Sequence, residues 1–144
     1  MARATSGWCT WTHSGAPRPF LAEAYTESTP RISPDGRSIA YVTNRTGRFE
    51  VYVHPISDGP EVQVSVEGGV QPVWGPDGRE LFYIERGVFM SARLAGGQRL
   101  AVLRRDSLYF RADFLTGRQF GDYDVFPDGR EFLMLKPVDR VNPP

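Results

Sequence analysis

Short apolar runs alternate with polar turns along the whole chain, and the runs are too short for helices of ordinary length. Three of them, SIAYVT (38–43), ELFYIE (80–85) and EFLMLK (131–136), follow turns that share one core sequence: SPDGR (33–37), GPDGR (75–79) and FPDGR (126–130). In such a turn proline presets φ, aspartate accepts hydrogen bonds from nearby backbone N–H groups, and glycine takes the left-handed conformation. The pattern therefore predicts three β-hairpins, with structural turns at Pro34, Asp35 and Gly36, at Pro76, Asp77 and Gly78, and at Pro127, Asp128 and Gly129.

Further short strands surround these hairpins. A strand precedes each turn, at TPRIS (29–33), VQPVW (70–74) and YDV (123–125). Two more strands follow each of the first two hairpins, at FEVYVHP (49–55) and EVQVSV (61–66), and at VFMSARL (88–94) and RLAVL (99–103). The sequence thus predicts two four-stranded antiparallel units, 29–66 and 70–103, and units repeated at about forty residues are typical of propeller blades.

The two ends of the chain have the pattern of half-blades. GWCTWT (7–12) and RPFLA (18–22) predict the third and fourth strands of a blade over 7–23, and residues 121–136 predict the first and second strands of another. We therefore expect one all-β domain over 1–144, a partial β-propeller of about three four-stranded antiparallel blades, two whole and one split between the chain ends. Known propellers close with about four blades or more. Either two copies join head to tail into a six-bladed ring, or the chain is a shortened piece of a longer propeller.

Three segments carry a specific resemblance: TPRISPDGRSIAYVTNRTGRFEVYVHPI, QPVWGPDGRELFYIERGVFMSARL and YDVFPDGREFLMLKPV. Over about residues 17–138 they resemble the WD-repeat-like propeller repeat of the TolB type. Their order is also similar to the propeller sensor region at the C-terminus of bacterial serine/threonine protein kinases. The resemblance implies a propeller fold and a role in protein–protein interaction or ligand sensing.

The chain also departs from these families. The second unit lacks an N-x-x-G turn after its second strand, and the third unit stops after two strands. The sequence has no kinase motif, neither a Gly-rich loop with a strand lysine nor H-R-D or D-F-G, and no G-x-S-x-G elbow of a hydrolase. We predict no enzymatic activity. The alternative is a sensor-propeller fragment of a serine/threonine protein kinase or of a propeller-bearing peptidase.

Charge and composition narrow the choice of partners. Seventeen basic residues balance seventeen acidic ones, so the net charge favours neither nucleic acid nor an anionic membrane as a partner. No apolar stretch approaches the length of a membrane span or of a signal peptide, so we expect no membrane insertion. As written the chain would be cytoplasmic, and it would be periplasmic as a fragment of a longer exported chain. The expected partners are a protein or peptide, and a second copy or the remainder of a propeller.

The sequence predicts no metal site and no cofactor. Cys9 is the single cysteine, and His13 and His54, the two histidines, have no second ligand at metal spacing. The repeated Asp35, Asp77 and Asp128 lack the alternating oxygen ligands and distal glutamate of a calcium loop, so their context indicates turns.

One segment stands out as a candidate binding loop. SLYFRADFLTGRQFGDY (107–123) lengthens the interval between Pro-Asp-Gly motifs from 42 to 51 residues, and insertions in repeat proteins often lie on the binding face. Asp122 and Asp124, two residues apart, would face one side of an inner strand. The alternative is a long strand pair crossing between blades. The candidate binding residues are Arg111, Asp113, Phe114, Arg118, Phe120, Asp122 and Asp124.

Overall fold

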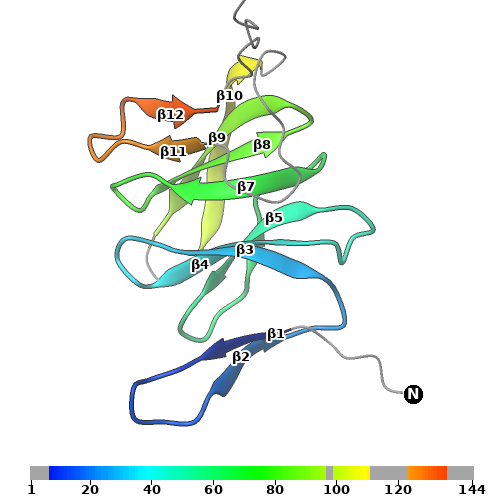
Figure 1. Ribbon diagram of the computed structural model, residues 1–144. Coiled ribbons are helices and arrows are strands. Elements are labelled where there is room, and N and C mark those ends of the chain that lie inside the picture. The colour runs from blue at the N-terminus through cyan, green and yellow to red at the C-terminus, as the bar shows by residue number, and fades with distance from the viewer. Residues whose placement is uncertain (1–6, 97–98, 111–122, 136–144) are drawn as a thin grey trace, which may run out of the picture.

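Four antiparallel sheets stack in chain order in the computed structural model, which describes residues 7–96, 99–110 and 123–135 (Figure 1). The stack begins with a two-stranded sheet of β1 (Gly7–Thr10) and β2 (Arg18–Ala22). It ends with a two-stranded sheet of β11 (Tyr123–Val125) and β12 (Phe132–Met134). Two four-stranded sheets lie between them.

The first four-stranded sheet is a meander of β3 (Glu27–Ile32), β4 (Ser38–Thr43), β5 (Glu50–Pro55) and β6 (Val62–Gln63). Side chains of β4 are buried along its whole length, as its nearly continuous apolar run indicates, because neighbouring layers cover both faces. β6 is shorter than the run EVQVSV predicts. Beyond Gln63 the chain turns away, and the buried Val64 and Ser65 belong to the connection that leads to the next sheet.

The second four-stranded sheet contains β7 (Gly69–Trp74), β8 (Glu80–Glu85), β9 (Val88–Ala95) and β10 (Ala101–Phe110). Arg86 and Gly87 both have positive φ in the two-residue turn between β8 and β9, which suits the twist of a tight hairpin. The structure differs from the sequence expectation at β10, which continues to Phe110 instead of ending at 103. Two register shifts let β10 stay paired with β9, so residues 107–110 of the expected binding loop are strand.

The three Pro-Asp-Gly turns have the same geometry. The side chain of each aspartate accepts a hydrogen bond from the N–H two residues on, at 3.0 Å for Asp35, 2.9 Å for Asp77 and 3.0 Å for Asp128. The glycine φ values are 70°, 66° and 70°, a left-handed conformation that L side chains rarely adopt. A β3–β4, β7–β8 or β11–β12 hairpin results in each case.

Apolar side chains between the sheets form two core clusters. The first contains Ala40, Val42 and Val53 of the first four-stranded sheet, together with Trp74, Leu81 and Tyr83 of the second. The second cluster joins Phe82, Ile84 and Phe89 to Tyr123, with Val125, Phe132 and Met134 packed against it. Edge-to-face contacts of Phe132 with Phe82 and Phe89, with centroids 4.8 and 4.9 Å apart, fix this second interface.

These observations confirm the predicted fold class, an all-β partial β-propeller. Four-stranded antiparallel meanders repeat along the chain, pack face to face and align their first strands β3, β7 and β11 along one edge of the stack. The described part of the chain contains no helix with the length and apolarity that crossing a membrane requires.

Candidate interaction surface

A groove of about 530 Å³, which we call the inner-strand groove, runs along the first strands of the three units. Arg31, Val73 and Asp124 take equivalent places in it, each lying three residues before a Pro-Asp-Gly motif. The groove combines one cationic and one anionic side chain with apolar walls, a composition that binding sites often have. Its lining residues are Arg31, Val73, Tyr123, Asp124, Leu133, Met134 and Leu135.

A repeated backbone distortion shapes this edge. The β3–β4 and β7–β8 pairings each shift register, and the equivalent residues Thr29 and Gln71 have φ of 51° and 57°. Left-handed backbone is costly for a β-branched residue such as Thr29. Aromatic donors of the next unit bind nearby carbonyls: the indole Nε1 of Trp74 donates to Arg31 O at 2.8 Å, and the Tyr123 hydroxyl donates to Gln71 O at 2.7 Å.

The structure places one of the seven candidate binding residues. Asp124 lies on β11, is exposed and lines the inner-strand groove, while its carboxylate accepts a hydrogen bond from the N–H of Val125 at 2.8 Å. The other six, Arg111, Asp113, Phe114, Arg118, Phe120 and Asp122, lie outside the described residues, so their role stays a prediction.

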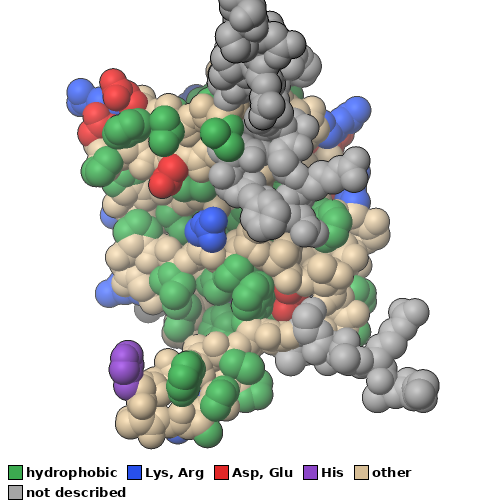
Figure 2. Space-filling view, in the orientation of Figure 1, with side chains coloured by type: hydrophobic (Ala, Val, Ile, Leu, Met, Phe, Trp, Pro, Cys, Tyr) green, Lys and Arg blue, Asp and Glu red, His purple; other side chains and the backbone are tan. Residues whose placement is uncertain are grey.

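The β11–β12 hairpin has one covered face and one open face. Tyr123, Val125, Phe132 and Met134 point toward the second four-stranded sheet. The opposite face presents Leu133 and Leu135, both exposed. Hydrophobic side chains are visible over this hairpin and over the β1–β2 sheet, with acidic and basic side chains around the hairpin tip (Figure 2).

The first four-stranded sheet carries a polar cluster on the face turned away from the second. The Tyr41 hydroxyl donates to Glu61 at 2.6 Å, Arg45 pairs with the other oxygen of the same carboxylate, and the Arg45 guanidinium lies 3.8 Å from the centre of the Tyr52 ring. Glu27 is buried beside this cluster, and its Oε2 has no hydrogen-bond partner. This face is therefore built from charged and aromatic groups, unlike the apolar interfaces between the sheets.

The cluster shifts the pKa values of its members. Burial raises the pKa of Glu61, but hydrogen bonds from Arg45 and Tyr41 outweigh burial, so the pKa lies below its usual value. Burial and the neighbouring Glu23 raise the pKa of Glu27. Burial and the hydrogen bond to Glu61 raise the pKa of Tyr41. Glu61 thus stays ionised against Arg45 at neutral pH, whereas ionised Glu27 is held at a cost.

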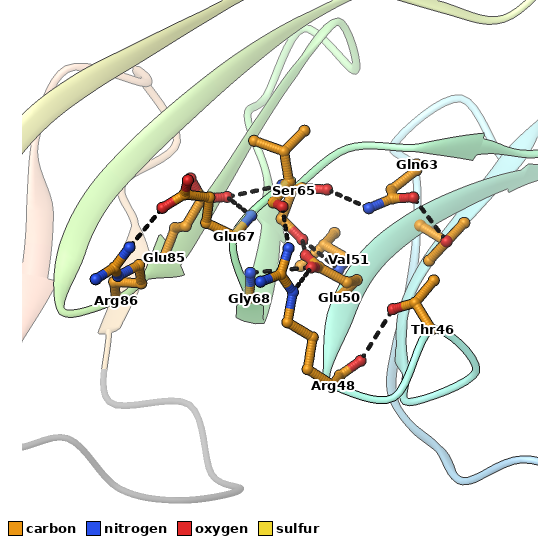
Figure 3. Close-up of polar contacts among 12 residues, drawn as sticks. Thr46, Arg48, Glu50, Val51, Gln63, Ser65, Glu67, Gly68, Glu85 and Arg86 are labelled. Atoms are coloured by element: carbon orange, nitrogen blue, oxygen red, sulfur yellow. Dashed lines mark hydrogen bonds and ion pairs between the residues drawn. The ribbon is translucent and has the colours of Figure 1, made fainter.

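A second, buried network fixes the connection between the two four-stranded sheets (Figure 3). The Glu50 carboxylate is fully buried and accepts hydrogen bonds from Arg48 Nε at 2.5 Å, from Gly68 N at 3.0 Å and from the Ser65 hydroxyl. Ser65 Oγ in turn accepts from Val51 N at 2.8 Å.

Glu85, from the second four-stranded sheet, also binds the connection between the two sheets. It lies at the end of β8 and accepts hydrogen bonds from Val66 N at 2.9 Å and Glu67 N at 3.3 Å. Glu50 of the first four-stranded sheet and Glu85 of the second therefore both accept hydrogen bonds from the backbone of residues 66–68, which connect the two sheets (Figure 3).

The remaining candidate groups form no metal site in the part of the chain that the structure describes. Among the described residues, no three acidic, histidine or cysteine side chains are arranged so that they could hold a metal ion. His13 is exposed, and the ring of His54 contacts Phe20 edge-on, with centroids 5.7 Å apart. Cys9 is an exposed free cysteine.

Sequence reasoning missed two features of this surface. It did not select Arg31 and Val73 as groove residues, although counting back from each Pro-Asp-Gly motif would have grouped them with Asp124. It also did not identify the Tyr41–Arg45–Glu61 cluster, because these side chains come from different strands and turns, and their meeting depends on the strand register.

Comparison with known proteins gives short matches. No family model matches the chain. A stretch of 55 residues is 40% identical to Tricorn protease homolog 1 of Streptomyces coelicolor, covering 36% of this chain and 5% of that protein. A stretch of 56 residues is 41% identical to the Tol-Pal system protein TolB of Alcanivorax borkumensis, covering 37% of this chain and 13% of that protein.

One solved structure covers most of the chain. The crystal structure of TolB from Acinetobacter baumannii aligns over 91% of this chain and 43% of its own, with a TM-score of 0.48 and 15% identity. The chain spans only a small part of either curated relative. The local match to TolB supports the resemblance that the repeated Pro-Asp-Gly-Arg segments show.

Proposed function

We propose that the chain is a non-enzymatic β-propeller module for protein–protein interaction, which completes its open half-blade with two strands of a second copy. The carrying observation is that the two-stranded sheets are complementary halves. The β11–β12 hairpin has the Pro-Asp-Gly turn that joins the first and second strands of each whole blade. The β1–β2 pair directly precedes β3 in the chain, just as β5 and β6, the third and fourth strands of the first whole blade, precede β7 of the second.

Backbone pairing supplies the attraction in this proposal. Within the four-stranded sheets, the second strand pairs with the first on one side and the third on the other. In the described structure β12 pairs only with β11, so its outer edge offers backbone N–H and C=O groups to another strand. A β1 strand from a second copy would give the order β11–β12–β1–β2, the same as in the whole blades. Exposed edges template such pairing.

Two copies would then form a ring of six blades. Each copy contributes two whole blades, and each pair of half-blades from different copies makes one more. A contact between unlike surfaces closes into a ring only if the rotation per copy suits, and it polymerises otherwise. Figure 1 shows one two-stranded sheet at each end of the stack, as this arrangement requires.

The part of the inner-strand groove on the first strands, at Arg31, Val73 and Asp124, is the proposed display surface for a protein or peptide partner. The Arg31 and Asp124 side chains are exposed, and Arg31, Val73 and Asp124 all lie on β-strands. We propose no catalytic step at this surface.

A second candidate function has its own support. The local match to Tricorn protease homolog 1, of which this chain covers 5%, favours a piece of the propeller in a larger protein. In that case the strands that complete each half-blade come from the rest of the same protein, and a kinase or a peptidase part would lie elsewhere in it. The two candidates differ in self-association.

Light scattering across a concentration series tests the proposal. We expect a stable species with twice the chain mass of 16.2 kDa. Removing residues 1–23 should abolish association because it removes β1–β2, and circular dichroism of the trimmed chain checks that the rest stays folded. A monomer at all concentrations would favour the second candidate. A ladder of larger species would contradict a closed ring.

A further inference from the structure

The two formed interfaces between sheets use the same positions of the repeat. On the second strand of a blade, alternate residues face the next blade, as Ala40 and Val42 do in the first cluster and Phe82 and Ile84 do in the second. The next blade contributes two kinds of residue to the interface. One lies two places before its Pro-Asp-Gly motif, and it is Trp74 in the first interface and Val125 in the second. The others are alternate residues of that blade's second strand. Those strand residues are Leu81 and Tyr83, and Phe132 and Met134.

The same positions are open at the two ends of the stack. Leu133, equivalent to Ala40, is 65% exposed, whereas Ala40 is 0% exposed, and Leu135 is exposed beside it. Ile32, equivalent to Trp74, is 65% exposed, whereas Trp74 is 9% exposed. Ile39 and Tyr41 on the Ile32 side are already buried, so the open part of that face is centred on Ile32. Leu133 and Leu135 at one end and Ile32 at the other are therefore the exposed members of positions that pack together in the two formed interfaces.

The turns show the same complementarity. Consecutive Pro-Asp-Gly turns stack, so that a side chain at Gly78 would lie 3.6 Å from Pro34 Cδ, and one at Gly129 would lie 3.2 Å from Pro76 Cδ. A side chain added at Gly36, the first glycine of the series, would have no atom within 4 Å of its Cβ apart from its chain neighbours. In this series the proline of one turn contacts the glycine position of the next turn. Gly36 of the first turn and Pro127 of the last turn are therefore the two members without such a contact among the three turns.

We propose that the β11–β12 hairpin of one copy docks on β3–β4 of a second copy, with Leu133 against Ile32 and Pro127 beneath Gly36. This inference rests on the proposed self-association and specifies its register. The proposed register is taken from the repeat, because this docking would reproduce contacts that the chain makes twice between its own sheets. The occupant is a second copy, since its end face carries the missing members of each pair.

Cysteine cross-linking between copies tests the register. In a Cys9→Ser background, the Gly36→Cys variant is mixed with the Pro127→Cys variant and oxidised, while light scattering follows association. The double variant Pro34→Cys/Gly78→Cys calibrates the method within one chain, because those turns already stack. A mixture of the Gly36→Cys and Gly78→Cys variants is the mismatched control. We expect a cross-linked dimer from the first mixture and none from the mismatched one.

The outcomes separate the two proposals. Association without a cross-link, when the calibrating pair does cross-link, overturns the register and leaves the proposed function standing. Equal cross-linking in the matched and mismatched mixtures also overturns the register. Absence of association overturns both proposals.

A matched pair of charge variants gives an independent reading. Leu133→Glu should weaken association at least tenfold, because it puts a charge into the docked face. Leu103→Glu should leave association unchanged, because Leu103 is just as exposed, at 66%, but lies on the outer strand β10. Unchanged association of the Leu133→Glu variant, or equal weakening by both variants, contradicts the docking.

Discussion

Replacing Glu50 with alanine should destabilise the chain more than any surface substitution. Glu50 is fully buried and is the shared acceptor for the Ser65 hydroxyl, the Gly68 N–H and Arg48. Removing the carboxylate leaves the hydroxyl and the N–H without an acceptor inside the protein. Each orphaned buried donor costs about 1–3 kcal/mol.

The magnitude follows from which partners are buried. The Arg48 side chain is more than half exposed, so its ion pair adds little, typically below about 1 kcal/mol. The Ser65 hydroxyl is fully buried and the Gly68 N–H is only partly buried and costs less, so together they lower the free energy of unfolding by about 2–5 kcal/mol. With a urea m-value of about 1–3 kcal/mol per molar, the midpoint should fall by roughly 1–2 M.

Urea unfolding followed by tryptophan fluorescence measures this shift. Arg86→Met is the control and should cost less than about 1 kcal/mol, since both members of the Arg86–Glu67 ion pair are exposed and Glu50 keeps all its partners. The double variant Glu50→Ala/Ser65→Ala should recover none of the loss, because it removes the orphaned hydroxyl but leaves the buried Val51 N–H without the Ser65 Oγ that accepts its hydrogen bond. A loss below about 1 kcal/mol for Glu50→Ala would refute the reasoning that this network holds the two sheets together.

Three further substitutions test other parts of the structure. Glu27→Gln should stabilise the chain at pH 7, because the raised pKa means that ionised Glu27 destabilises the fold; the gain should vanish in urea titrations below about pH 4, and a loss at pH 7 would contradict it. Thr29→Gly should raise stability by about 1 kcal/mol by relieving left-handed backbone, measured as a higher urea midpoint, and a lower midpoint would argue against strain there. Tyr123→Phe should cost about 1–2 kcal/mol by removing the hydrogen bond to the Gln71 carbonyl, and an unchanged midpoint would show that this bond contributes nothing.

The repeated turns explain why so much of the fold could be predicted. A Pro-Asp-Gly turn is a local structure: its φ values and its aspartate hydrogen bonds depend on residues within the same tetrapeptide. The apolar run after each turn follows from the same local argument. The predicted end of the last strand of the second unit, at residue 103, was wrong, because the end of a strand depends on its partner strand. β10 continues to Phe110 because β9 supplies pairing partners beyond residue 103.

The candidate site depended on longer-range contacts. Arg45 and Glu61 lie sixteen positions apart and meet because the pairing of β5 with β4 and β6 sets Tyr41, Tyr52 and Glu61 on one face, where the Arg45 side chain lies over the Tyr52 ring. Leu133 and Ala40 are equivalent in the repeat, yet one is exposed and the other buried, because only one has a sheet packed on it. No local pattern contains that difference.

The sequence by itself determined the strands, their turns and the repeat, because these follow from backbone preferences and from the spacing of apolar side chains. The tertiary structure alone decided which faces were covered, that the Glu50 carboxylate would be buried among donors, and that Arg31, Val73 and Asp124 would share one groove. The physical reason is that burial and pairing depend on residues far apart in the chain, whose approach is set by the stacking of whole sheets.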